Sequence, residues 1–508
     1  MSNAEIASYR VEDGVAVLTI DSPPVNALGH AVRIALCEGV TRALDDPEAK
    51  ALVLICGGRT FFAGADVTEI GKPILPPLLA DVMAAFEGST KPIVSAMHGT
   101  ALGGGLELAL AGHYRVAVPS AVVGLPEVAL GLLPGAGGTQ RVPRLIGVAA
   151  AVEMIGLGKP VKAEQALQIG LIDAIVPEGE LETRAIGFAR DLVANGAPLR
   201  RVRDQAPNLT LEEARVVFDR FRAANPDLFF GLKAADGVLQ AIEAAITLPF
   251  EAGLNREREI SRALIAGPES AAQRHLFFAE RAAAKLPGAE KAKAGDGRVA
   301  MLPDTGDRAT YLAAIAEADG ELILATRFLD AFDDLAGAAV DPSKLVGMRT
   351  VEGVTEIILG PQTNAQAALQ AMAITKKRGE TAIFVSPAPG GVVQRLSEKI
   401  AVTIAGLLSK GVPAGVIAAT GRNFGFRDAL LPDGNGEPDP AIEQRLIYPV
   451  LAEAIALRGE GVAKRSSDID VAMVKAKLWP VWRGGPAFMA DRIGPDVVRA
   501  GLTEPAPA

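Results

Sequence analysis

Two glutamates lie in surroundings that suit acid–base chemistry. Glu107 follows three glycines in ALGGGLELALAG (101–112), at the start of an apolar stretch with helical character. Glu127 lies among apolar neighbours in VVGLPEVALGLLPGAGGTQR (122–141), a setting that raises the pKa of a carboxyl group once it is buried. Two carboxyls that converge on one water share a proton, so that one serves as the base and the other as the acid.

Each of these features also has a purely structural explanation. A carboxylate at a helix start, as at Glu107, complements the helix dipole, and an isolated glutamate such as Glu127 is more often a surface residue of a loop. A third stretch, GRTFFAGADVTEI (58–70), either directs the backbone N–H of Ala63 into a site or forms an ordinary tight turn. Composition and spacing leave these alternatives open.

The elements that must position these residues alternate between β-type and helical stretches. The β-type runs of residues 1–190 are VAVLTI (15–20), AKALVLIC (49–56), KPIVSAMHG (91–99) and YRVAVP (114–119). This alternation indicates an α/β unit with a mostly buried sheet. Residues 191–290 carry apolar residues at helical spacing without β-type runs, which predicts an all-helical block. The polar stretch GAEKAKAGDGR (288–298) is typical of a linker.

Bulk composition excludes several classes of protein. The 508 residues suggest roughly three to four domains, and the net charge of −9 favours no polyanion, so we expect no nucleic-acid partner. Two cysteines and four scattered histidines offer neither a disulfide framework nor a metal site. The start, MSNAEIASYRVED, lacks a signal-peptide layout, and the final EPAPA matches no retention or peroxisomal signal. We therefore expect a soluble cytoplasmic protein without membrane insertion.

Taken together, these stretches resemble the crotonase superfamily of enoyl-CoA hydratases and isomerases. The resemblance covers nearly all of residues 8–190. It includes SPPVNALG (22–29), FFAGADV (61–67), the whole run from HGTALGGG to RLIG (98–147) and KPVKAEQALQIGLIDAIVP (159–177). A match of this length and order is highly specific. It implies a spiral of ββα turns, a thioester oxygen held by two backbone N–H groups, and catalysis by glutamate.

The resemblance also implies roles for individual residues. The N–H donors fall on Ala63 and Gly104, and the two catalytic glutamates fall on Glu107 and Glu127. The segments that line the coenzyme A channel contain Ala27, Leu28, Ala65 and Asp66. The implied reaction is hydration of 2-trans-enoyl-CoA to 3-hydroxyacyl-CoA, with Δ3–Δ2 enoyl-CoA isomerisation as a second activity. No metal and no separate cofactor are implied, because coenzyme A is part of the substrate.

Beyond residue 190 the chain resembles the multifunctional β-oxidation enzymes of the peroxisomal type. The helical block 191–290 resembles their linker, and HLFFAERAAAK (275–285) matches the helix that closes the coenzyme A site in those proteins. This implies substrate contacts from Phe277, Phe278, Arg281 and Lys285. The alternative for this stretch is a plain amphipathic helix.

In such enzymes an NAD-dependent 3-hydroxyacyl-CoA dehydrogenase follows, opening with a strand and G-x-G-x-x-G. Here the matching stretch, RVAMLPDTGDRATYL (298–312), has one glycine, Gly306, between Asp304 and Asp307. Two acids at that place oppose a pyrophosphate by charge repulsion. The family's histidine, acid and asparagine positions align with Arg349, Leu359 and Gln394. We therefore expect a remnant half that does not bind NAD.

The sequence thus predicts four parts. They are an α/β crotonase spiral (1–190), a helical linker that completes the coenzyme A site (191–290), a degenerate, shortened Rossmann-like α/β segment (296–385) and α-helical dehydrogenase-type modules (386–508). We expect a monomeric acyl-CoA hydratase that works alongside other β-oxidation enzymes. The alternatives are an intact hydratase and NAD-dependent dehydrogenase, and a binding protein that only gathers acyl-CoA or partner enzymes.

Overall fold

A computed structural model describes residues 6–502 except 67–68, 70–71, 74, 290–293, 295–298, 303–307, 319–321 and 326–340. The chain divides into two compact units, Met1–Ser270 and Ala271–Ala508. The division falls within the helical block 191–290, most of which therefore belongs to the first unit. The four-part organisation expected from the sequence is finer than these units and stays a prediction.

The main sheet of the first unit has the order β1-β2-β3-β4-β6-β9. Its strands β1 and β2 pair antiparallel, and all later neighbours pair in parallel. The strands are β1 Ala7–Glu12, β2 Val15–Ile20, β3 Ala51–Cys56, β4 Ile93–Met97, β6 Tyr114–Ala117 and β9 Ala174–Ile175. Every residue of β3 and of β4 is buried, as is usual for parallel strands covered on both faces. The β-type runs predicted from the sequence are therefore confirmed as β2, β3, β4 and β6.

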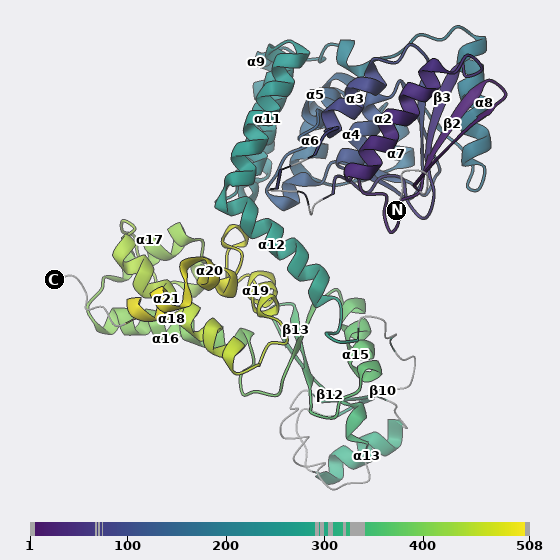
Figure 1. Cartoon of the computed structure of the whole chain (residues 1–508). Helices are drawn as coiled ribbons and strands as arrows, with labels where there is room; N and C mark the ends of the chain where they lie inside the picture. Colours follow the sequence, from purple (N-terminus) through teal and green to yellow (C-terminus); the bar gives the residue numbers. More distant parts are fainter. Residues whose placement is uncertain are drawn as a thin grey trace. The chain divides into compact units, whose positions relative to one another are not determined.

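A second, smaller sheet lies between these segments in the sequence. It has the order β5-β7-β8, with strands β5 Thr100–Leu102, β7 Val122–Gly124 and β8 Val161–Lys162. The helices of the first unit are α2 His30–Asp45, α3 Leu79–Glu87, α4 Gly104–Ala111, α5 Gly138–Ile146, α6 Val148–Leu157, α7 Ala163–Gln168, α8 Leu181–Ala194, α9 Leu211–Ala224, α10 Ala234–Thr247 and α11 Phe250–Ala266 (Figure 1). Helices α10 and α11 pack on each other and on α5, so the helical block contributes to the first unit.

The second unit contains a mixed sheet with the order β10-β11-β12-β13-β14, in which only β12 and β13 pair antiparallel. Its strands are β10 Val299–Met301, β11 Leu322–Ala325, β12 Leu345–Val351, β13 Val354–Leu359 and β14 Thr381–Val385. Its helices are α12 Pro268–Ala283, which begins at the division, α13 Arg308–Ala318, α15 Ala365–Lys377, α16 Val393–Ser409, α17 Ala414–Phe424, α18 Pro440–Gly459, α19 Ser466–Lys475, α20 Pro486–Ile493 and α21 Pro495–Gly501. The expected α/β segment followed by helical modules is confirmed.

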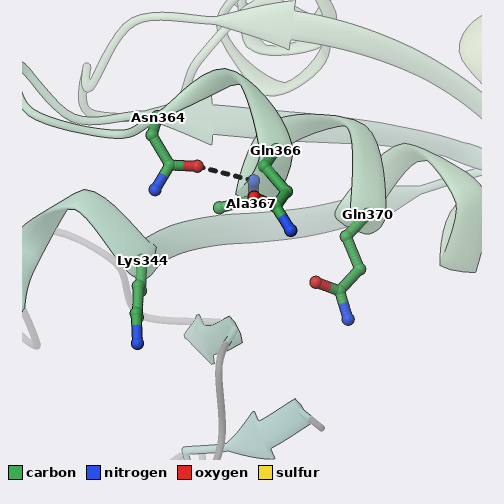
Figure 2. Close-up of a pocket in the computed structure, with 5 residues that line it drawn as sticks. All are labelled: Lys344, Asn364, Gln366, Ala367 and Gln370. Carbon is green, nitrogen blue, oxygen red and sulfur yellow. Dashed lines mark hydrogen bonds between the residues drawn. The ribbon is translucent and has the colours of Figure 1, made fainter. Parts of the chain in front are cut away.

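A small pocket of the second unit lies at the start of α15 (Figure 2). Asn364 caps this helix, because its side-chain oxygen accepts a hydrogen bond from the N–H of Ala367 at 2.8 Å. The pocket is lined by Lys344, Asn364, Gln366, Ala367 and Gln370. Across the portion of the chain that the structure describes, no helix has the length and apolar character needed to cross a membrane.

Candidate active site

The start of helix α4 places Glu107 inside the first unit. Gly103 precedes the helix with a φ of +52°, a left-handed conformation that favours glycine, and its carbonyl accepts the N–H of Glu107 at 3.0 Å. Glu107 lies in the first turn and is only 2% exposed. The glycines predicted to open a helix beside this carboxyl therefore do so.

The Glu107 carboxyl is oriented by the turn that leads into helix α5. Its Oε1 accepts hydrogen bonds from the N–H groups of Ala136 at 2.9 Å and Gly138 at 2.7 Å. Burial raises the pKa of Glu107, while these two amides and the charge of Arg141 act in the opposite direction. Two donors on one oxygen stabilise the ionised form, so the arrangement suits a carboxylate that accepts a proton.

Glu127 is the first residue of the short 3-10 helix η2 (Glu127–Leu130), and its carboxyl lies against Gly103. A Cβ atom on Gly103 would be only 2.7 Å from Glu127 Oε1, so this close approach requires glycine. Glu127 Oε2 is buried and has no hydrogen-bond partner among the residues with described positions. Burial and the neighbouring charge of Glu107 raise the pKa of Glu127 well above its ordinary value.

Two backbone N–H groups lie free beside this pair. Gly104 is the first residue of α4, and a Cβ atom on it would be 3.2 Å from the backbone nitrogen of Ala65. Ala65 is joined to Leu28 by an isolated parallel bridge, in which the N–H of Leu28 donates to the carbonyl of Gly64 at 2.9 Å. Within the described chain neither the Gly104 nor the Ala65 amide donates a backbone hydrogen bond.

The prediction that Ala63 supplies one of the two N–H donors is wrong. Its N–H donates to the carbonyl of Val25 at 3.2 Å and is therefore occupied. Between Ala63 and Ala65 the chain turns at Gly64, whose φ is +137°, so the amide two residues later is the one that stays free. Sequence reasoning found the segment that contains an unoccupied amide but assigned it to the wrong residue, because the direction of an N–H depends on the local backbone.

The segments expected to line the coenzyme A channel lie side by side. The Leu28–Ala65 bridge joins them, and a Cβ atom on Gly29 would be 3.3 Å from Asp66 Oδ2. The side chain of Leu28 is buried at 1% exposure, whereas Ala65 is exposed. Substrate contacts from Ala27, Leu28, Ala65 and Asp66 stay predictions.

A third buried carboxyl, Glu257 of helix α11, was missed by the sequence analysis. It is 0% exposed, and its Oε1 accepts the N–H of Gly137 at 2.7 Å. Burial, together with the charge of Glu107, raises the pKa of Glu257 to about 8. A sequence signal for it existed, because Glu257 falls on the apolar face of α11 that also carries Phe250, Gly253, Leu254, Ile260 and Leu264.

The aromatic and basic residues expected to close the coenzyme A site lie in the second unit. The Phe277 and Phe278 rings have centroids 5.5 Å apart, and the guanidinium of Arg281 lies 3.6 Å above the Phe277 ring. Phe278 is 46% exposed, and the carbonyl of Lys285 accepts a hydrogen bond from Arg465. Their role toward the site of the first unit stays a prediction.

The dehydrogenase positions of the second unit are only partly described. Asp304, Gly306 and Asp307 lie outside the described residues. Arg349 donates from Nε at 3.1 Å and from Nη2 at 2.6 Å to Glu356 Oε2, and Glu356 is fully buried. In this hairpin β12 and β13 pair Leu359 with Val346 and place Glu356 opposite Arg349, and the alignment of the acid position with Leu359 stays a prediction.

The third aligned position, Gln394, donates its side-chain amide to Glu398 one helical turn later, at 2.8 Å. This bond runs along the exposed surface of α16. Throughout the described residues, no group of three or more His, Cys, Asp and Glu side chains is placed to hold a metal ion.

Comparisons with known proteins concern the N-terminal part of the chain. Residues 10–219 match the enoyl-CoA hydratase/isomerase family. The chain is 44% identical over 280 residues to the peroxisomal bifunctional enzyme of Danio rerio, a match that covers 54% of this chain and 38% of that protein. It is 39% identical over 286 residues to the peroxisomal fatty acid beta-oxidation multifunctional protein MFP2 of Arabidopsis thaliana, covering 54% and 39% of the two chains.

Among solved structures, the carnitinyl-CoA hydratase from Mycobacterium avium is 31% identical, with a TM-score of 0.41. That match covers 54% of this chain and 96% of the hydratase. The chain spans about two-fifths of the length of the curated relatives it matches. The similarity to the enoyl-CoA hydratase/isomerase family is thus that of residues 10–219, in the N-terminal region of the chain.

Proposed function

We propose that the first unit hydrates 2-trans-enoyl-CoA to 3-hydroxyacyl-CoA. One observation carries this proposal: the buried Oε2 of Glu127 lacks a hydrogen-bond partner among the described residues, next to a second carboxyl and two free amides. A buried polar atom without a partner costs free energy, so it is expected where a ligand supplies the partner. Water and an enoyl thioester are the ligands that this combination of groups would serve.

The amides of Ala65 and Gly104 are the donors we propose for the thioester oxygen. Attack at Cβ of the enoyl group moves negative charge onto that oxygen, and preorganised N–H groups stabilise the charge as it forms. A helix start adds to this effect, since the dipole of α4 favours negative charge at Gly104. Ala65 takes the role that the sequence analysis assigned to Ala63.

The two glutamates would divide the proton transfers between them. Glu107, ionised and held by two amides, takes a proton from water as the water oxygen bonds to Cβ. Glu127, which keeps its proton because its pKa is raised, gives that proton to Cα. The product gains one molecule of water, and the pair is reset when the proton on Glu107 passes to Glu127. Each such transfer contributes about 10²–10⁴ to the rate.

We propose Δ3–Δ2 isomerisation as a second activity of the same site, because one carboxyl suffices to move a proton between two carbons. The reaction needs no cofactor besides the coenzyme A of its substrate. We further propose that the protein acts as a monomer, alongside other enzymes of β-oxidation, in the cytoplasm. The curated relatives are named peroxisomal and glyoxysomal, so their location is not carried over.

We propose that the second unit does not oxidise 3-hydroxyacyl-CoA. An arginine cannot act as a general base, because it stays protonated in proteins. Arg349, at the position aligned with the family's histidine, is moreover engaged with the buried Glu356. The alternative of an intact bifunctional enzyme predicts NADH formation from a 3-hydroxyacyl-CoA. Clear turnover in that absorbance assay would contradict the remnant interpretation.

The test of the main proposal is a substrate panel. Straight-chain, branched, alicyclic and steroid-derived 2-enoyl-CoA and 3-enoyl-CoA thioesters are each followed for hydration and for a shift of the double bond. We expect hydration of at least one 2-enoyl class and its loss in the doubly substituted Glu107→Gln/Glu127→Gln protein. Hydration that survives this double substitution would show that the site lies elsewhere.

A further inference from the structure

The turn at the start of helix α5 divides its amides between two carboxyls. The N–H groups of Ala136 and Gly138 donate to Glu107, whereas those of Gly137 at 2.7 Å and Thr139 at 3.1 Å donate to Glu257. Alternate amides therefore point to opposite sides of one short segment. The position of Glu107 and that of Glu257 are coupled through four consecutive residues.

Glu257 is held on both of its oxygens. Oε1 accepts from Gly137, and Oε2 accepts from the N–H and, at 2.5 Å, from the hydroxyl of Thr139. Thr139 is itself fixed, because the side-chain amide of Gln140 donates to its hydroxyl at 3.0 Å and to the carbonyl of Ala241 at 2.8 Å. Glu257 thus has a single well-defined position, set by helices α5 and α10.

A neutral side chain would fix this turn at a lower electrostatic cost. The titratable and charged groups around Glu257 are Glu107, whose charge raises the pKa of Glu257, Arg141, which lowers it, and Glu127, whose own pKa is raised by a charge on Glu257. Arg141 is already paired with Glu87 at 2.8 Å. Neighbouring carboxyls of like charge disfavour one another's ionisation. We therefore expect a third buried carboxyl here only if its ionised form changes the properties of its neighbours.

We propose that Glu257 is a positioning residue of the hydratase site: its two oxygens hold the turn whose other two amides orient Glu107. This inference rests on the proposed function. Glu257 does not touch the reacting atoms and acts only through its neighbours. The hydrogen bonds of Glu257 fix the turn before helix α5. Its charge, once the carboxyl ionises, acts on the pKa of Glu127.

The consequence is a specific pH dependence. Glu257 gives up its proton near its pKa of about 8, and its new charge raises the pKa of Glu127, as does the charge of Glu107. Glu127 therefore stays protonated to higher pH than it would beside a neutral residue. Removal of the charge at position 257 lowers the pKa of Glu127, so the alkaline limb of the pH–rate profile moves to lower pH.

The test compares Glu257→Gln with Glu259→Gln in the full chain. Glu259 lies on the same helix, is exposed and pairs with Arg256, so it is matched in charge and in helix position. For Glu257→Gln we expect about a tenfold lower kcat, a KM within about twofold, and an alkaline limb shifted down by about half a pH unit or more. Glu259→Gln should behave as wild type.

A second variant covers the case in which Glu257→Gln fails to fold. Thr139→Val removes the hydroxyl bond that lowers the pKa of Glu257, so Glu257 ionises later and the alkaline limb again moves to lower pH. If folded Glu257→Gln or Thr139→Val protein keeps the wild-type pH profile, the inference is wrong. A wild-type protein that hydrates no enoyl-CoA would instead refute the proposed function, which separates the two failures.

Discussion

Two glutamates with buried carboxyl oxygens, one in each unit, show how differently a carboxyl can be used. Glu356 of the second unit is fully buried, and all of its bonding capacity is used: Arg349 donates twice to Oε2, and the N–H groups of Val392 and Val393 donate to Oε1. Glu127 of the first unit has a buried oxygen for which the described chain offers no partner, and a like charge beside it.

This difference separates a structural carboxyl from a reactive one. Around Glu356 the Arg349 guanidinium and the amides at the start of helix α16 occupy both carboxyl oxygens, which leaves neither oxygen for a ligand. Around Glu127 burial and repulsion stabilise the protonated form, and the free oxygen can reach a ligand. Burial alone therefore does not identify an acid–base residue; at Glu127 a buried oxygen without a partner and a neighbouring like charge occur together.

The largest expected effect comes from exchanging each of these carboxyls for its amide. Glu107→Gln and Glu127→Gln should each lower kcat for hydration about 10²–10⁴-fold, and the double variant should lose little more, because the pair acts as a unit. Glu356→Gln should leave hydration unchanged. The loss of the conjugated enoyl absorbance measures all of these rates, and equal losses in Glu127→Gln and Glu356→Gln would remove the distinction drawn here.

The second-largest expected effect tests the two backbone amides proposed as donors, those of Ala65 and Gly104. In Gly104→Ala the new Cβ meets the Ala65 nitrogen at 3.2 Å and Leu79 Cδ2 at 3.1 Å, so the two N–H groups must move apart. We expect a fall in kcat that approaches the about 10²–10³-fold cost of losing one donor. Gly187→Ala in helix α8 is the matched control, because its Cβ meets nothing within 4 Å. Full activity of Gly104→Ala would rule out this pair of donors.

The second unit should respond in stability and not in catalysis. Arg349→Met leaves the buried Glu356 without its cation, and breaking a buried pair costs about 3–5 kcal/mol. We expect the free energy of unfolding of this unit to fall by about 3 kcal/mol, at the lower end of that range, because two backbone amides still bind Glu356. Denaturant unfolding measures the change, and hydration rates should stay at the wild-type level. Unchanged unfolding would show that the pair contributes nothing.

The smallest effect concerns the pH dependence of stability in the first unit. The pKa of Glu257 is raised to about 8 from an ordinary value of 4.5, so between these values the folded state binds more protons than the unfolded state. The contribution of this group is fully present below pH 4.5 and is lost as pH rises to about 8. Glu257→Gln should flatten that decline in Tm, and Glu259→Gln should not. If Tm declines with pH equally steeply in both variants, Glu257 is not protonated in the folded protein.

The central strands and the helix start that carries Glu107 could be predicted from the sequence because the signals are local. The strands are continuous apolar runs, and Gly103 directly precedes the helix that begins at Gly104 and carries Glu107. The proximity of Glu107 and Glu127 came from the resemblance to a family, since spacing alone left Glu127 on a loop surface.

What could not be predicted depends on contacts across the chain. The choice between the amides of Ala63 and Ala65 depends on which one meets the carbonyl of Val25, nearly forty residues earlier. Glu257 lies in NREREI (255–260), where charged neighbours suggest a solvated helix face, and only the apolar residues one turn away reveal that it is buried. A glutamate on the apolar face of a helix is therefore as much a candidate site residue as a glutamate beside a glycine-rich turn.

The most direct test follows oxygen from water into the product. The full chain is incubated with a 2-enoyl-CoA in water enriched in heavy oxygen, and mass spectrometry measures the label in the 3-hydroxyacyl-CoA. We predict one labelled oxygen per product molecule with the wild type and with Glu356→Gln, and no product above background with Glu127→Gln. Labelled product from Glu127→Gln at the wild-type rate, or none from the wild type with any acyl chain, would contradict the assignment of this buried pair.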